Sequence, residues 1–192
     1  MIRTFARMTR AFRRGEDGNM TIEFVIVLPL IFSIFMMSFE SGLLMMRSVM
    51  LERAVDMTMR ELRLGQIPIA NPTDMSVELK KRICARTVII ANCTTAVRIE
   101  MLPVNMAVWN MPTTTPGCVD RTQAVQVAED FTIGGQHELM LTRVCALQRA
   151  IFPTLGLGDQ FVGLGKGLTG GQTGGFGEYG LIVMSSFVNE PQ

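Results

Sequence analysis

Residues 20–46 read MTIEFVIVLPLIFSIFMMSFESGLLMM and decide the fold of this 192-residue chain. Glu23 and Glu40 are the charged residues in this stretch. With its flanks, the apolar run between them reaches the roughly 20 residues that a helix needs to cross about 30 Å of hydrocarbon. The stretch therefore predicts a membrane-spanning helix. Pro29 lies inside it and predicts a kink or a locally loosened turn, because proline removes one backbone hydrogen bond.

A cleaved secretory signal peptide is the competing interpretation of this stretch. Such a peptide has an apolar region of about 7–15 residues followed by a site of small residues. Here the apolar run is longer and ends in SFESGLLMMRS. The sequence therefore favours a retained span.

The residues before the span are basic. Residues 1–18 contain five arginines, two acidic residues and no lysine. Positive residues that flank a first span stay in the cytoplasm, so we expect the N-terminus there and the rest of the chain in the periplasm. This segment is either a charged leader or a short basic helix on an anionic membrane surface.

Composition limits the classes of function. The chain is 48% apolar and 18% charged, with a formal net charge of +1 and a single histidine. This charge balance argues against a nucleic-acid binder, which normally carries a basic face. One histidine gives little material for a metal site or acid–base catalysis.

Helical spacing continues after the span. Apolar residues recur with helical periodicity as far as Leu64, where Gly65 and Pro68 predict a stop. One helix from Met20 to Leu64 would be about 65–70 Å long, which is twice the hydrocarbon thickness. Its outer half must then pack either on the downstream domain of its own chain or on neighbouring helices.

The rest of the chain predicts a small α+β domain with an antiparallel sheet. We divide the chain into a leader over 1–18, a spanning helix and arm over 19–65, and a periplasmic domain over 66–192. Within that domain the pattern predicts a linker over 66–73, a helix over 74–91, and a flexible glycine-rich loop over 156–180.

Strands are predicted from alternating apolar residues. In the first, Val97, Ile99 and Met101 would face a core, and Arg98 and Glu100 would face water. The further predicted strands cover residues 107–111, 119–128, 138–147 and 179–188.

Four cysteines, Cys84, Cys93, Cys118 and Cys145, follow the span. In an oxidising compartment an even number predicts disulfides, and the zinc spacing Cys-x-x-Cys is absent. Three pairings are open. We favour Cys84–Cys93 at the junction of helix and strand, with Cys118–Cys145 joining two strands.

The sequence contains no motif typical of an enzyme active site. His137 follows two glycines and is expected in a surface loop, without an obvious nucleophile near it. Trp109 and Tyr179 are expected in the core or the sheet. The glycines at 165, 167 and 170 match a nucleotide fingerprint, but the helix that the fingerprint requires does not follow. We predict no catalytic, metal-binding or cofactor-binding residue.

One short motif joins the leader to the span. Gly18-Asn19-Met20-Thr21-Ile22-Glu23-Phe24, followed by an apolar run that contains Pro29, resembles the leaders of type IV prepilins. More specifically, it is similar to TadE-like minor pilins, or pseudopilins, of tight-adherence pilus systems. The resemblance implies cleavage between Gly18 and Asn19 by a membrane prepilin peptidase.

The resemblance also implies roles and partners. After cleavage, Glu23 would lie four residues from the new amino group of Asn19 and could neutralise it, while Phe24 and Pro29 belong to the same assembly segment. The partners implied are membrane lipid, the peptidase, other pilin subunits and the pilus assembly platform. The protein would lie in the inner membrane or in an extracellular pilus. The alternative is an uncleaved single-span protein whose periplasmic domain binds a ligand or protein.

Overall fold

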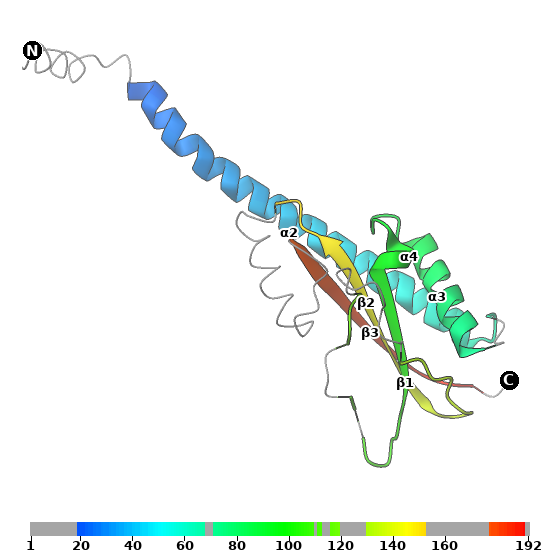
Figure 1. Ribbon diagram of the computed structural model, residues 1–192. Coiled ribbons are helices and arrows are strands. Elements are labelled where there is room, and N and C mark those ends of the chain that lie inside the picture. Colours follow the sequence, from blue (N-terminus) through cyan, green and yellow to red (C-terminus); the bar gives the residue numbers. More distant parts are fainter. Residues whose placement is uncertain are drawn as a thin grey trace, which may run out of the picture.

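The computed structural model describes residues 19–67, 71–109, 111–112, 116–119, 130–152 and 177–190. A long helix, α2 (Asn19–Arg63), leads into a domain formed by α3 (Pro72–Arg86), α4 (Cys93–Ala96) and a three-stranded sheet. Figure 1 shows the first half of α2 extending away from this domain, which lies along its second half. The predicted α+β architecture, a long N-terminal helix followed by a small antiparallel sheet, is confirmed.

Helix α2 is continuous over 45 residues and passes through Pro29 without a break. It ends where Gly65 adopts a left-handed conformation with φ 67°. The Gly65 N–H then donates to the Leu62 carbonyl and the Gln66 N–H to the Glu61 carbonyl, at 3.0 Å each. These bonds satisfy carbonyls that a helix end leaves open, which explains the termination close to the predicted residue.

The sheet is a simple antiparallel meander. Its strands are β1 (Val97–Val104), β2 (Leu139–Arg149) and β3 (Glu178–Val188), in the order β1-β2-β3. Val97 pairs with Ala146, which in turn pairs with Leu181. Because side chains alternate along a strand, these three residues lie on one face of the sheet.

That face packs on the second half of α2 and on α3. The Thr142 hydroxyl in β2 donates to the Met59 sulfur in α2 at 3.4 Å, which fixes the side of the sheet that faces the helix. The buried side chains in the second half of α2 are Leu51, Ala54, Val55, Thr58, Met59 and Leu62. The outer half of α2 thus packs on the domain of its own chain, the first of the two alternatives left open by the sequence.

Helix α3 differs at both ends from its prediction. It begins at Pro72, inside the predicted linker, with Asn71 as the residue before the first turn. It ends at Arg86 rather than at residue 91, because the N–H and hydroxyl of Thr87 both bind the Ile83 carbonyl, at 3.1 and 3.0 Å. A short helix that the sequence did not predict, α4, follows after Asn92, which has φ 51°.

Two disulfides tie the domain together, and they join the pairs favoured above. Cys84–Cys93 links α3 to the first residue of α4, with Cα atoms 5.5 Å apart. Cys118–Cys145 links the segment 116–119 to the middle of β2, with Cα atoms 5.3 Å apart. All four cysteines are therefore bonded.

Three predicted segments need correction or lie outside the described chain. Residues 106–109 form a turn closed by the Trp109 N–H and the Asn105 carbonyl at 2.8 Å, so the strand predicted over 107–111 is wrong. Trp109 is 62% exposed and does not belong to the core. Residues 120–129 and 153–176, which carry most of the strand predicted over 119–128 and of the glycine-rich loop, lie outside the described residues. The last residues of that predicted loop belong to β3.

The prediction that Arg98 and Glu100 face water is also wrong. Both lie on the sheet face opposite α2, but their exposed fractions are 8% and 5%. The segment 116–119 lies against them, since the Gly117 N–H donates to the Glu100 carboxylate at 3.0 Å. Arg143 pairs with the same carboxylate at 2.8 Å. Alternation correctly assigned these residues to one face, but it could not show that the face is covered.

Candidate functional site: an exposed stem and its junction with the sheet

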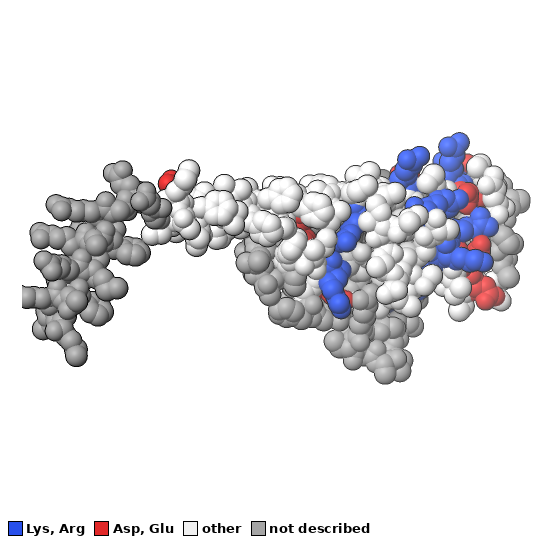
Figure 2. Space-filling view, turned by 90° about the horizontal axis from the view of Figure 1, so that it is seen from above, with Lys and Arg blue, Asp and Glu red and all other residues white. Residues whose placement is uncertain are grey.

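The first half of α2 is an exposed apolar stem, which we define as residues 20–39. None of its side chains is buried in the described structure, and Phe24 is 61% exposed. Among the described residues, α2 is the one helix long and apolar enough to cross a membrane. In Figure 2 this stem is almost entirely white, and charged side chains gather over the domain. An apolar surface of this length is unfavourable in water, which indicates a membrane anchor.

The residues predicted for processing and assembly fall at the start of this stem. Gly18 and the side chain of Asn19 lie outside the described residues. Asn19 is the first residue of α2, and Glu23 lies four residues further on the same helix, so the two positions share one face. Glu23, Phe24 and Pro29 are all exposed. Glu23 and Phe24 therefore lie exposed in the first two turns of α2, and Pro29 lies near the middle of the stem.

At the other end of the stem, Glu40 joins α2 to the sheet. Its side chain is buried, with an exposed fraction of 2%. The carboxylate accepts the backbone N–H of Ile151 at 3.1 Å and that of Phe152 at 3.2 Å, just after β2 ends. A buried carboxylate needs such donors because desolvation otherwise disfavours its charged form.

Two turns later, Arg47 makes a second contact with the same end of the sheet. Its guanidinium donates to the Tyr179 hydroxyl at 2.9 Å and to the Arg149 carbonyl at 3.3 Å. Burial raises the pKa of Tyr179, and the hydrogen bond from Arg47 opposes that shift. Glu40 and Arg47 together attach the ends of β2 and β3 to the helix, and we call this arrangement the junction.

No role for the junction could be predicted from the sequence. Glu40 was visible as an acid in an otherwise apolar stretch, and Arg47 as the first basic residue after it. The signal that could have found them is the cost of an acid in such a place, which calls for a partner. The partners are backbone groups and the Tyr179 hydroxyl, all more than 100 residues away, and no sequence pattern identifies those.

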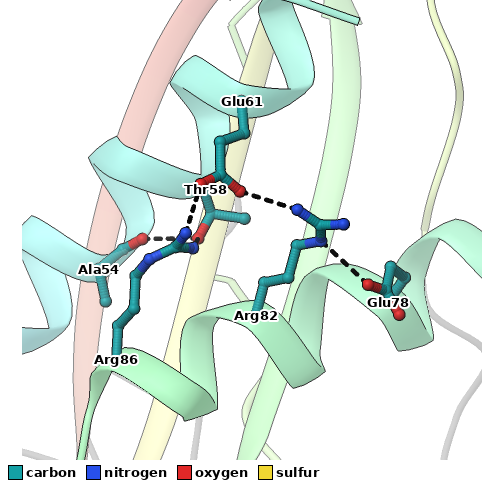
Figure 3. A network of polar contacts seen from close by, with 6 residues as sticks. All are labelled: Ala54, Thr58, Glu61, Glu78, Arg82 and Arg86. Carbon is teal, nitrogen blue, oxygen red and sulfur yellow. Dashed lines mark hydrogen bonds and ion pairs between the residues drawn. The ribbon is translucent and has the colours of Figure 1, made fainter. Parts of the chain in front are cut away.

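A polar network holds the distal end of α2 against α3, as Figure 3 shows. Glu61 of α2 pairs with Arg82 at 3.0 Å and with Arg86, both from α3. Arg82 also pairs with Glu78 at 2.9 Å, and Arg86 donates to the Thr58 hydroxyl at 3.0 Å. The hydrogen bond from Arg82 is the main cause that holds the pKa of Glu61 below its ordinary value. This network orients α3 against α2.

No group of three or more His, Cys, Asp or Glu side chains in the described ranges could hold a metal ion. A small pocket between Leu62, Met140 and Phe187 has room for about one water, with a volume of about 20 Å³. His137 lies exposed in a turn with φ 63°, where its N–H binds the Asn189 carbonyl at 2.9 Å.

Comparison with known proteins gives one match. The family model described as TadE-like protein matches residues 18–60. No curated protein and no solved structure matches the chain. The matched segment begins at Gly18, contains the whole stem and the junction residues of α2, and ends one turn before the helix does. The resemblance to TadE-like proteins of tight-adherence pilus systems is thereby confirmed for this segment.

Proposed function

We propose that this chain, TadE-like over residues 18–60, is a minor pilin or pseudopilin-like structural protein that supports assembly of a tight-adherence pilus. A prepilin peptidase would remove residues 1–18 on the cytoplasmic side. The chain from Asn19 onward would cross the inner membrane once, with the sheet domain in the periplasm. The family is structural rather than enzymatic, which agrees with the role proposed.

The exposed apolar stem carries this proposal. The stem supplies about 20 residues without a packing partner in the described structure. It directly follows the basic leader and the Gly18-Asn19 peptide bond. Lipid can cover such a surface before assembly, and the stems of other subunits can cover it afterwards. Exposed apolar side chains also continue beyond Glu40 at Met45, Met46 and Val49, so a packed stem could extend past the membrane.

Glu23 has a physical role in this scheme. Cleavage after Gly18 would create an ammonium group at Asn19, one helical turn from the Glu23 carboxylate. In a bundle of stems both groups leave water. An ammonium without its carboxylate would then cost about 3–5 kcal/mol, whereas the pair is tolerated.

The alternative function is an uncleaved membrane protein whose domain binds a partner. One observation favours it: the turn after β1 exposes apolar side chains. Met106, Val108, Trp109 and Met111 are 49%, 70%, 62% and 48% exposed. Such a cluster is typical of interaction surfaces. It is compatible with either function, whereas removal of the leader is expected for the pilin alone.

The experiment compares two acidic residues of α2 in cells that carry the peptidase and the pilus system. Glu23→Gln is expected to insert into the membrane and to be processed normally. Filament yield in the sheared fraction should fall by more than about tenfold, given the cost of an unpaired ammonium.

Glu52→Gln is the matched control, because Glu52 is exposed on the same helix outside the stem. It is expected to leave filament yield unchanged. Equal yields from wild type and Glu23→Gln would contradict the proposal, and so would equal losses in the two variants.

A further inference from the structure

The position of Glu40 along α2 sets the depth at which the sheet begins. Glu40 lies 21 residues after Asn19 and 17 after Glu23, which correspond to about 31 Å and about 25 Å of helix. The hydrocarbon of a bilayer is about 30 Å thick. With either residue at the cytoplasmic edge, Glu40 therefore lies at the outer edge of the hydrocarbon or just inside it. Any tilt of the helix moves Glu40 deeper.

The structure removes Glu40 from that environment by covering it with the end of the sheet. Its carboxylate is bound to the backbone of Ile151 and Phe152, so these residues lie at the same depth. The Ile151 side chain is nevertheless 45% exposed. An apolar side chain at this height faces the boundary between acyl chains and headgroups.

Two arginines lie near the same place. The Arg149 side chain is 74% exposed, lies two residues before Ile151 and pairs with Glu178 at 3.7 Å, and Arg47 contacts the Arg149 carbonyl. Figure 2 shows basic side chains as a band where the white stem meets the domain. Guanidinium groups just outside the hydrocarbon are placed to bind lipid phosphates, as basic residues near membrane surfaces do.

We propose that this end of the sheet is a lipid-binding surface that rests on the periplasmic leaflet of the inner membrane. Ile151 inserts at the top of the acyl chains, Arg149 binds anionic headgroups, and the Glu40 contacts hold the sheet at that height. This inference rests on the membrane span of the proposed function. It adds that the domain sits directly on the bilayer, with β2 and β3 extending away from it.

The test places one tryptophan at a time in the full chain, in a Trp109→Phe background. The protein is reconstituted into vesicles of phosphatidylcholine and phosphatidylglycerol that carry bromine near the headgroup end of the acyl chains. Ile151→Trp is expected to show blue-shifted emission and strong quenching. Phe152→Trp replaces one aromatic side chain by another at the next residue. It is expected to show the same blue shift and quenching, and it serves as the test if Ile151→Trp does not fold.

Val188→Trp is the matched control, because Val188 is 42% exposed in the same sheet. It pairs with Leu139 at the other end of β2, about 33 Å from Arg149 along the strand. It is expected to show neither blue shift nor quenching. Emission and quenching of the residue 151 and 152 variants equal to those of Val188→Trp would overturn the proposal.

Ile26→Trp, in the first half of the stem, separates this inference from the function on which it rests. Quenching at residue 26 without quenching at 151 or 152 leaves the membrane span intact and overturns the lipid-binding surface alone. The absence of quenching at residue 26 overturns both.

A further experiment replaces phosphatidylglycerol by phosphatidylcholine in the vesicles. Quenching at residue 151 should then weaken, and Arg149→Gln should abolish this dependence on lipid charge. An unchanged dependence would overturn the role of Arg149.

Discussion

At the scale of single residues, Glu23 and Glu40 show two ways of placing an acid on an apolar helix. Glu40 is fully enclosed, and the backbone N–H groups of Ile151 and Phe152 bind it. Glu23 is exposed at the free end of the stem, four residues from Asn19. The first acid has its partners within the folded chain, whereas the proposed partner of the second arises only when the leader is removed. The two residues therefore respond differently to substitution.

Replacement of Glu40 is expected to destabilise the sheet domain itself. Glu40→Ala removes the acceptor of two partly buried backbone N–H groups, each of which then lacks a partner. We expect the free energy of unfolding to fall by about 1–3 kcal/mol. Chemical unfolding in detergent, followed by circular dichroism, measures this change. Glu52→Ala, on the exposed side of the same helix, should lie within about 0.5 kcal/mol of wild type, and equal losses in both variants would contradict the role of the junction.

At the scale of elements, α2 is one helix with two different environments. Before Glu40 none of its apolar side chains is buried, and from Leu51 onward a stripe of them is buried against the sheet. In the proposed function lipid or other subunits cover the exposed part, whereas the buried part packs on α3 and the strands. The contact of α2 with α3 includes the Glu61 ion pairs, which make it sensitive to pH.

Acid is expected to weaken the contact between α2 and α3. The pKa of Glu61 is lowered from its ordinary value of 4.5, chiefly by the hydrogen bond from Arg82. A lowered folded-state pKa means that the stabilisation is complete above the unfolded-state value and is lost as pH falls through the folded-state value. Thermal unfolding should therefore show Glu61→Gln below wild type at neutral pH, with the difference closing below about pH 4.5. A difference that stays constant down to lower pH would contradict this assignment.

The two disulfides are expected to contribute unequally. Cys118–Cys145 closes a separation of 27 residues and Cys84–Cys93 one of 9, and the longer loop restricts the unfolded chain more. Replacing the first pair by serine should cost about 3.5 kcal/mol and the second about 2.5 kcal/mol on that basis. The first replacement also frees the segment over Glu100. Denaturant unfolding of the two double variants gives the order, and a larger loss for the Cys84–Cys93 pair would contradict it.

The elements that could be predicted from sequence are those with a strong local pattern. The uncharged run of α2 gave the correct element, and the alternation at Val97, Ile99 and Met101 gave both the correct element and the correct core face. The end of α3 was missed because Thr87 closes the last turn with its own side chain, although the apolar spacing continues to Ile90. Burial of Glu100 was missed because its cover comes from a segment brought back by a disulfide.

At the scale of the whole molecule, the chain joins an exposed apolar stem to a sheet domain. The core between α2, α3 and the sheet holds the domain on the distal half of the helix. The junction at Glu40 attaches the end of the sheet nearest the stem to α2. The stem could be predicted from a local motif, because the residues from Gly18 to Pro29 are contiguous in sequence. The junction joins Glu40 to Ile151 across more than 100 residues, so it required the three-dimensional structure.

The most direct test of the account is the intact mass of the protein extracted from membranes and from sheared filaments of a host that carries the prepilin peptidase. The proposed pilin function predicts a chain that begins at Asn19 in both fractions, shorter than the full sequence by residues 1–18. A chain that retains residues 1–18 in that host would contradict it and would favour the uncleaved membrane protein with a binding domain.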